Sequence, residues 1–345
     1  MFKKVYLLLI LSAITSTAAL AQQSLDVNFN GLGFLDNREY KAFVPRSRTY
    51  SGTRTTLDFG LNLDSLNHFV VGVNALHEFG AIPFFGKVDP VAYYTFQNKT
   101  WLFNAGEFPR EGLTTDFPRA LLNDTLMYYR PNVQGLLVRY TSEHFTETGF
   151  IDWLSRQTDT QREQFIFAAS GKYMPNPYGP FYVSHYFMLM HDAGAAILLP
   201  NDHINDNGGF EIKLGLDLTH KQTTFDSLSF EAGTLVSLQR ERGVNGFKTP
   251  KGVVFNAYAS YHRIAVFEEF YHGQGSTIDY GDSYYEKPTY NRIDIIYTPF
   301  LFKHIKGQFI ASFHFSPGQF NDNQEVFRVS YDLGRKVLKR FNDDN

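Results

Sequence analysis

The sequence contains no cysteine, which excludes disulfide bonds, thiolate metal sites and cysteine nucleophiles. After residue 21 it also lacks any apolar run of the roughly 18 residues that a membrane-spanning helix needs. Its 32 Lys and Arg nearly balance its 35 Asp and Glu, and no basic cluster marks a nucleic-acid surface. None of the 11 His shows a metal-binding spacing such as HExxH. We therefore expect no cofactor, no metal and no nucleic-acid partner.

The N-terminus carries the three parts of a secretory signal. Lys3 and Lys4 supply positive charge, residues 5–14 form an apolar core, and Ala19-Leu20-Ala21 is a small-x-small cleavage site before Gln22. The alternative, a membrane anchor helix, needs a longer apolar core. We expect residues 1–21 to be a cleaved signal peptide. No cysteine follows the cleavage site, so a lipoprotein anchor is excluded.

The rest of the chain alternates apolar and polar residues in stretches of about ten. Residues 210–219 show the pattern most clearly: apolar side chains stand at even positions up to Leu218, and Glu211, Lys213 and Asp217 stand between them. Successive side chains of a strand point to opposite faces, so each such stretch has one apolar and one polar face. The pattern predicts strands rather than helices.

Sixteen such stretches follow one another, although fourteen or eighteen strands would also fit the pattern. They cover residues 24–33, 52–64, 68–79, 89–97, 100–109, 133–142, 148–156, 162–174, 180–192, 208–220, 224–242, 251–262, 263–272, 289–299, 307–316 and 324–334. An exported chain with an even number of such strands, and with short and long connections in alternation, predicts an all-β, antiparallel up-and-down barrel in the outer membrane of a Gram-negative bacterium. We assign residues 22–334 to the barrel and 335–345 to a solvated periplasmic tail.

A soluble β-sandwich would show the same alternation with its faces reversed. In the second stretch Arg54, Asp58 and Asn62 oppose Leu57, Phe59, Leu61 and Leu63, and parity does not say which side meets water. Aromatic residues make up 17% of the chain, with 34 Phe and 21 Tyr. Such enrichment suits the lipid-facing bands of a barrel. We therefore expect the charged face to line the barrel interior.

The interior face carries both signs of charge. The candidate pore-lining residues are Arg54, Asp58, Arg139, Asp152, Arg156, Arg162, Lys172, Glu211, Lys213, Asp217, Glu231, Arg292, Asp294, Arg328 and Asp332. Opposed basic and acidic rows in an open pore would select small polar solutes. The same groups could instead pair across strands and fill the lumen. Both alternatives remain open from the sequence.

The longest connection, residues 110–132, contains three residues of each sign: Arg110, Glu111, Asp116, Arg119, Asp124 and Arg130. It resembles the long early loop that folds into porins and narrows them. A surface loop is the equally weighted alternative. The balanced charge predicts neither anion nor cation selectivity.

A barrel enzyme is the competing class. Ser184 and His185 are adjacent, so they point to opposite faces and cannot form a nucleophile–base pair. His191 with Asp192 is a candidate acid/base pair near the outer rim, and His203 with Asp202 and Asp206 is a candidate metal group. A His beside an Asp in a polar segment is commonplace, and we expect the chain not to be an enzyme.

Three short segments resemble the Asp-(Ser/Thr)-aliphatic acceptor site for O-glycosylation in Bacteroidetes. They place candidate modification at Ser65, Thr125 and Ser227. Asp-Ser is also ordinary turn chemistry, so the pattern is of low specificity.

In its export signal, its strand rhythm over residues 24–334 and its Tyr- and Phe-rich faces, the chain resembles porin-like outer-membrane β-barrels. The resemblance implies passive or gated diffusion of small polar solutes, with outer-membrane lipid around the barrel. The chain departs from porins in ending on a polar tail rather than on an aromatic residue of the last strand. The alternative function is a non-conducting scaffold or accessory subunit, with an outer-membrane or periplasmic protein as its partner.

Overall fold

The computed structural model describes residues 23–41, 45–197 and 202–341, apart from the side chains of residues 319–321. The signal-peptide prediction lies outside these residues. The strands are β1 Ser24–Glu39, β2 Arg48–Asn62, β3 Asn67–Glu78, β4 Lys87–Gln97, β5 Trp101–Pro109, β6 Asn132–Thr141, β7 Phe145–Ser155, β8 Glu163–Tyr173, β9 Phe181–Ala193, β10 Asn205–Asp217, β11 Ser227–Glu241, β12 Lys251–Tyr261, β13 Ile264–Gly273, β14 Thr289–Leu301, β15 Ile305–Ser316, β16 Gln319–Asp332 and β17 Lys336–Arg340. The helical turns are α2 Leu126–Tyr129 and η1 Ser283–Glu286. In the described residues no helix is long and apolar enough to cross a membrane.

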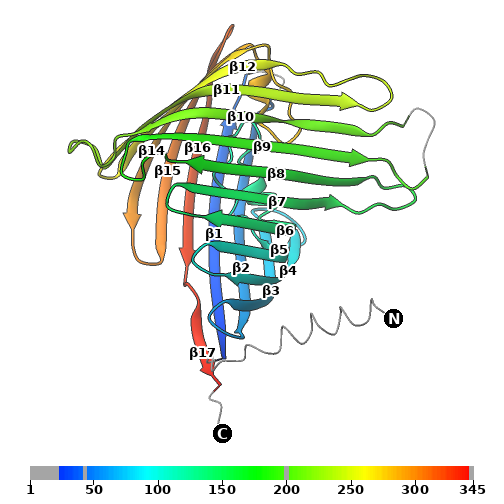
Figure 1. The fold of residues 1–345 in the computed structure, drawn as a ribbon, viewed down its shortest axis with the longest axis vertical. Coiled ribbons are helices and arrows are strands. Elements are labelled where there is room, and N and C mark those ends of the chain that lie inside the picture. Colours follow the sequence, from blue (N-terminus) through cyan, green and yellow to red (C-terminus); the bar gives the residue numbers. More distant parts are fainter. Residues whose placement is uncertain (1–22, 42–44, 198–201, 342–345) are drawn as a thin grey trace.

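The first sixteen strands form a closed antiparallel barrel (Figure 1). Each strand pairs with its neighbours in sequence, and β1 closes the barrel against β16 in a register that runs from Asn30↔Asp332 to Glu39↔Asn323. The predicted sixteen-strand barrel is confirmed.

The two rims differ in the length of their connections. At the rim we call the long-loop rim, the connections are 40–47, 79–86, 110–131, 156–162, 194–204, 242–250, 274–288 and the two-residue turn 317–318. At the short-turn rim they are 63–66, 98–100, 142–144, 174–180, 218–226, 262–263 and 302–304. Outer-membrane barrels place short turns in the periplasm and long loops outside. By that rule the long-loop rim faces the cell exterior.

The apolar face of each strand points outward. In β2 the side chains of Leu57 and Phe59 are 42% and 44% exposed, whereas Arg54 and Asp58 are each only 3% exposed. A soluble sandwich would bury the first pair and expose the second. Exposed apolar bands fit a lipid environment, so the orientation that parity left open is the membrane one.

Several boundaries differ from the predicted ranges. β1 continues to Glu39, six residues beyond its predicted end, because polar residues such as Asn37 and Arg38 still pair with both β16 and β2. The apolar alternation stops earlier than the hydrogen-bonded ladder. The connection predicted at 34–51 therefore shortens to 40–47.

The C-terminal tail differs from the solvated segment predicted for residues 335–345. Residues 336–340 form β17, which pairs antiparallel with the first residues of β1 beyond the end of β16. Just before it, the Arg335 guanidinium pairs with the Asp26 and Asp58 carboxylates, each at 2.8 Å. A polar composition alone could not reveal this pairing, because its partners lie some 300 residues away along the chain.

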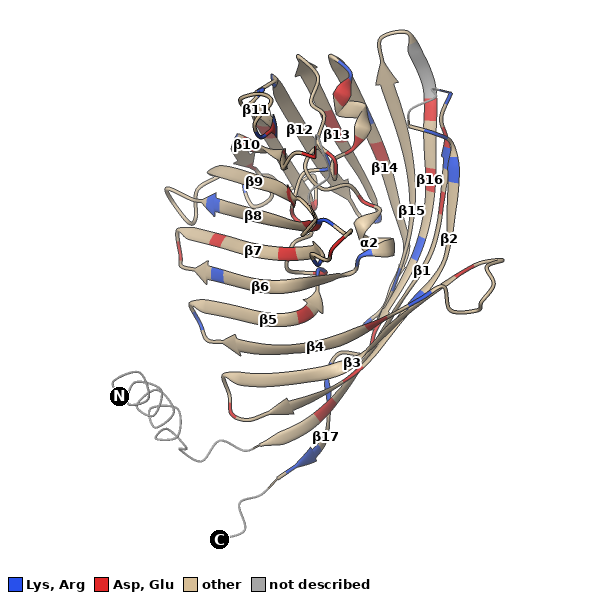
Figure 2. Ribbon diagram, turned by 90° about the vertical axis from the view of Figure 1, so that its right-hand side faces the viewer, with Lys and Arg blue, Asp and Glu red and all other residues tan. Residues whose placement is uncertain are grey.

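Two connections from the long-loop rim fold into the barrel. Residues 110–131, with α2, lie on the concave side of the sheet in Figure 2, and residues 274–288 pack against them. Phe117, Leu121 and Ile278 join one buried apolar cluster with inward side chains of the wall such as Leu137 and Met188. We call residues 110–131 and 274–288 the inner segments. They form an apolar core where a porin would hold water.

Candidate functional site

Most of the predicted pore-lining residues do lie on the inward face. These are Arg54, Asp58, Arg139, Asp152, Lys172, Glu211, Lys213, Asp217, Glu231, Arg292, Asp294, Arg328 and Asp332. Arg156 and Arg162 differ, because β7 ends at Ser155 and β8 begins at Glu163. Arg162 pairs instead with Asp192 and Asp202 at the long-loop rim.

Several of the interior charges pair with one another or with the inner segments rather than forming opposed free rows. Lys213 Nζ lies 2.9 Å from a carboxylate oxygen of Glu211 and 2.9 Å from one of Glu231. Arg110, from the first inner segment, pairs with Asp152 of the wall. Paired charges and an apolar core together fill much of the interior.

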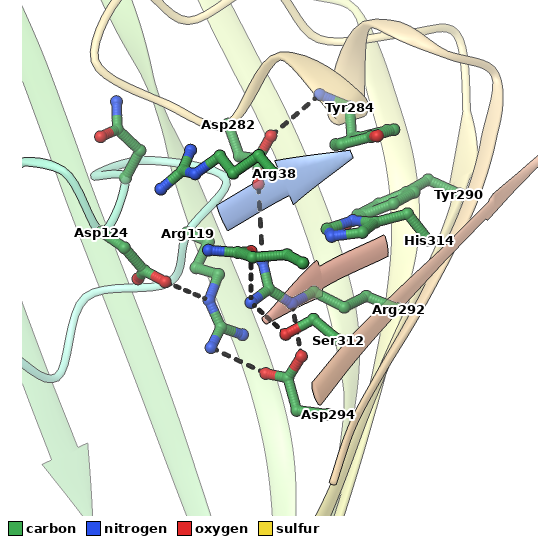
Figure 3. Close-up of polar contacts among 12 residues, drawn as sticks. Arg38, Arg119, Asp124, Asp282, Tyr284, Tyr290, Arg292, Asp294, Ser312 and His314 are labelled. Carbon is green, nitrogen blue, oxygen red and sulfur yellow. Dashed lines mark hydrogen bonds and ion pairs between the residues drawn. The ribbon is translucent and has the colours of Figure 1, made fainter. Parts of the chain in front are cut away.

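A buried polar network holds the two inner segments to the wall (Figure 3). Arg119 donates to Asp294 at 2.9 Å and lies 3.3 Å from Asp124. Arg292 donates to the other oxygen of Asp294 at 2.7 Å and lies 3.9 Å from Asp282. Ser312, Tyr284, Tyr290 and His314 surround this network with further hydrogen bonds and stacked rings. Each inner segment thus has a charged anchor on β14.

Two carboxylates of the inner segments respond differently to burial. Burial alone would raise the pKa of Asp124, but the charges of Arg119 and Arg292 lower it well below its ordinary value. Burial raises the pKa of Asp282, and Arg292 opposes that shift only in part. Asp124 is therefore the firmly ionised partner of the arginines.

We expect Asp294→Asn to destabilise the barrel by about 3–5 kcal/mol, because it leaves Arg119 and Arg292 without their shared carboxylate in a buried site. Urea unfolding of the lipid-inserted protein measures the change. Asp159→Asn, at an exposed loop position, is the matched control and should change stability by less than about 0.5 kcal/mol. Equal effects of the two substitutions would contradict an anchoring role for Asp294.

The candidate glycosylation residues lie in three different settings. Ser65 is exposed in a turn at the short-turn rim. Thr125 belongs to the first inner segment, where its hydroxyl bonds the Asn123 side chain. Ser227 begins β11, and its hydroxyl lies 3.1 Å from that of Thr219. Of the three, Ser65 is the one in an open turn.

Three His–carboxylate pairs occur among the described side chains. His68 pairs with Asp26 inside the barrel, near the short-turn rim. His185 lies 3.1 Å from Glu147 through Nε2, on the outward faces of β9 and β7. The third pair is His191 with Asp206. Its position and the imidazole nitrogen that it uses distinguish this pair from the other two.

His191 and Asp206 lie on the outside of the barrel, at its long-loop rim. In β9 the even positions Met188 and Met190 are buried inward, so His191 points outward. In β10 the odd position Glu211 is buried inward beside Lys213, and Asp206 therefore points outward too. The register pairs His191 directly with Asp206 across the two strands. The pair stands at the upper edge of the lipid-facing surface.

The hydrogen bonds of this pair leave one imidazole nitrogen free. His191 Nδ1 lies 2.7 Å from Asp206 Oδ1, whereas Nε2 has no hydrogen-bond partner in the described part of the chain. Arg240 Nε and Arg242 Nε donate to Asp206 Oδ2 at 2.9 and 2.8 Å. Asp206 is only 2% exposed, since these side chains cover it. We call His191, Asp206, Arg240 and Arg242 the rim cluster.

This geometry suits a general base. A carboxylate at Nδ1 keeps the proton on that nitrogen and leaves the Nε2 lone pair for a proton from water or from a hydroxyl. No described Ser, Thr or Tyr hydroxyl bonds His191. Arg240 and Arg242, whose side chains are 30% and 45% exposed, add positive charge at the long-loop rim.

The sequence offered His191 with Asp192 as a candidate pair, but the fold gives His191 a different carboxylate as its neighbour. Asp192, the partner expected from adjacency, points to the opposite face and pairs with Arg162 at 2.6 Å. The candidate metal group His203, Asp202 and Asp206 does not form: no set of three His, Asp or Glu side chains in the described ranges is placed to hold a metal ion. Asp202 and Asp206 instead form ion pairs with Arg162 and Arg242, respectively.

A protein-family model described as "Lipid A 3'-O-deacylase-type" matches residues 15–338. No curated protein matches the chain. Among solved structures, OccK8 (OprE) of Pseudomonas aeruginosa aligns over 91% of this chain and 98% of its own, with 10% identity and a TM-score of 0.55. OpdQ of the same species aligns over 92% and 98% with 10% identity and a TM-score of 0.52. Salmonella typhi OmpF aligns over 90% and 97% with 9% identity and a TM-score of 0.52. These likenesses show a porin-like fold alone.

One expectation from the sequence is overturned by this comparison. The chain was expected not to be an enzyme, yet the model that spans nearly all of it describes a deacylase family. The error came from weighing His–Asp adjacency within one strand. The pair that the fold brings together sits on two neighbouring strands.

Proposed function

Because the chain belongs to the Lipid A 3'-O-deacylase-type family, we propose that it is an outer-membrane hydrolase that removes an ester-linked acyl chain from lipid A or a related glycolipid. The observation that carries this proposal is the rim cluster. A His–Asp pair with a free Nε2 stands on the outward wall at the long-loop rim, where the ester region of an outer-leaflet lipid would meet the barrel.

The chemistry is a general-base hydrolysis of an ester. His191 Nε2 takes a proton from water as the water oxygen bonds to the ester carbonyl carbon. The ester C–O bond then breaks, and the imidazolium returns the proton to the departing sugar oxygen. Asp206, hydrogen-bonded at Nδ1, orients the ring and stabilises its positive charge while the proton resides on Nε2.

The two arginines would serve the substrate as well as the base. Both donate to Asp206 and hold it in place beside the imidazole. Their exposed donors add positive charge toward lipid phosphates or toward the oxyanion of the transition state. Phe165, whose ring centroid lies 5.1 Å from that of His191, offers an apolar neighbour for an acyl chain.

The diffusion of small polar solutes stays a prediction. Sixteen strands enclose room for water, but the inner segments place Phe117, Leu121 and Ile278 across that space. We therefore expect the barrel to conduct ions weakly at most. Hydrolysis of a lipid ester is better supported than solute diffusion as the function of the chain.

The test is acyl release by the purified, folded barrel in mixed micelles with lipid A. The expected result is free fatty acid together with a lipid A product lighter by one acyl chain. Heat-unfolded protein is the control and should release none. If the folded protein released no fatty acid from lipid A in this assay, the proposal would be refuted.

A further inference from the structure

We propose that the barrel holds a binding site for a small organic carboxylate inside its lumen, below the inner segments and open toward the short-turn rim. The site is a cavity of ≈ 290 Å³ between β1, β2, β15, β16 and the first inner segment. It lies on the inward face, apart from the rim cluster, and does not depend on the proposed hydrolase activity.

Three cationic side chains line the cavity: Arg54 from β2, Arg328 from β16 and Lys306 from β15. All three stand at inward positions of their strands. They approach from two sides of the barrel seam, where β1 joins β16 and β2. A ligand between them would meet positive charge from both sides.

These cations are weakly compensated. The hydrogen-bond acceptor found for Arg328 is the Tyr128 hydroxyl, at 2.9 Å, and neither Arg328 nor Lys306 forms an ion pair with any residue that the structure describes. Arg54 is 3% exposed, its contact with Asp89 is long at 3.5 Å, and its Nη2 has no partner. A buried guanidinium whose charge is only partly compensated, with one N–H group left without a partner, is costly. An anionic ligand would relieve that cost for Arg54 and Arg328.

The acids at the cavity do not neutralise these groups. Glu111 lines it but makes no ion pair among the described side chains. Asp332 lies at the mouth, where its carboxylate accepts the Gly334 backbone N–H at 2.8 Å. Neither acid contacts Arg54 or Arg328. Asp89 beside Arg54, and Asp36 and Asp124 on the far side of Arg328, offset part of the positive charge, but none of these three acids lines the cavity.

The cavity connects with the periplasmic side of the barrel. A second hollow of ≈ 350 Å³ at the short-turn rim shares Lys306, Ser330 and Asp332 with it. That hollow also carries Lys303 and His304. A path that is basic along most of its length therefore leads inward. It ends at Met127 and Tyr128 of the first inner segment.

The shape and lining favour a carboxylate over a bare ion. Arginine forks bind carboxylate and phosphate oxygens in pairs. Asn30, Gln308 and Ser330 add amide and hydroxyl groups for a hydroxylated ligand, and Leu32 and Met127 add an apolar wall. A cavity of this size approaches the lower limit of common ligand pockets. It would hold a molecule of the size of citrate.

Calorimetric titration of the folded full-length barrel at low salt tests this site. The probes are citrate, inorganic phosphate and the uncharged glycerol. We expect saturable citrate binding, weaker phosphate binding and no glycerol binding. Arg328→Gln and Lys306→Gln should each weaken citrate at least tenfold. Lys99→Gln removes a charge from an exposed turn at the same rim and should leave citrate binding unchanged.

Several outcomes would overturn the proposal. They are no citrate binding at millimolar concentration, phosphate binding that exceeds citrate binding, and an equal loss in Lys99→Gln, which would indicate a diffuse surface charge effect. Using two variants on different strands keeps the test informative if one of them fails to fold. Thermal unfolding of each variant confirms that the barrel is intact.

Discussion

Replacing His191 with glutamine is expected to lower the rate of lipid A deacylation by about 100- to 10,000-fold, the usual contribution of a general base. Glutamine keeps a polar side chain opposite Asp206 but cannot take a proton from water at neutral pH. The position is on the outer wall and outside the apolar core, so the barrel should fold as before. Rates of fatty-acid release from lipid A micelles give the measurement.

His185→Gln is the matched control. His185 also lies on the outward face of β9 beside a carboxylate, but it stands further from the long-loop rim and contacts Glu147 through Nε2. We expect its rate to match wild type. If His185→Gln lost as much activity as His191→Gln, the reaction could not be assigned to the rim cluster.

Replacing residues 113–127 with a Gly-Ser segment of equal length is expected to open the lumen. The change removes Phe117, Leu121, Leu126 and the Arg119 anchor, which hold the first inner segment across the barrel. A flexible polar chain would not keep water out of a sixteen-strand barrel, so single-channel conductance should rise by about tenfold or more. Planar-bilayer recordings measure it.

The same replacement at residues 157–161 is the control. That connection lies at the long-loop rim, and its residues are largely exposed. Its conductance should stay at the wild-type value. Wild-type protein that already conducts like an open porin would contradict the account of a filled lumen, whatever the variant shows.

The sequence predicts the barrel well because strand geometry is local. Apolar and polar residues alternate with a period of two along the strands. Charged residues such as Arg54 and Asp294 therefore identify the inward face from the sequence of a single strand, before the neighbouring strands are known. The same local signal explains the errors. It ends β1 at residue 33, because the adjacent apolar Phe34 and Leu35 interrupt the alternation and a polar run follows them, although pairing continues to Glu39.

The interior and the rim cluster depend on contacts that no local pattern contains. Whether residues 110–131 lie inside the barrel depends on Arg119 meeting Asp294, 175 residues further on. His191 meets Asp206 because the register of β9 and β10 aligns them. Parity alone could have placed both on the outward face. To choose Asp206 rather than Asp192 as the partner of His191, one must know which residue of β10 lies opposite His191 on the outward face.

The most direct measurement is the mass spectrum of lipid A from cells that produce either the wild-type chain or His191→Gln at equal levels in the outer membrane. We expect lipid A that has lost one ester-linked acyl chain in wild-type cells, and intact lipid A in cells with the variant. Intact lipid A in both, or the same deacylated product in both, would contradict a hydrolase whose base is His191.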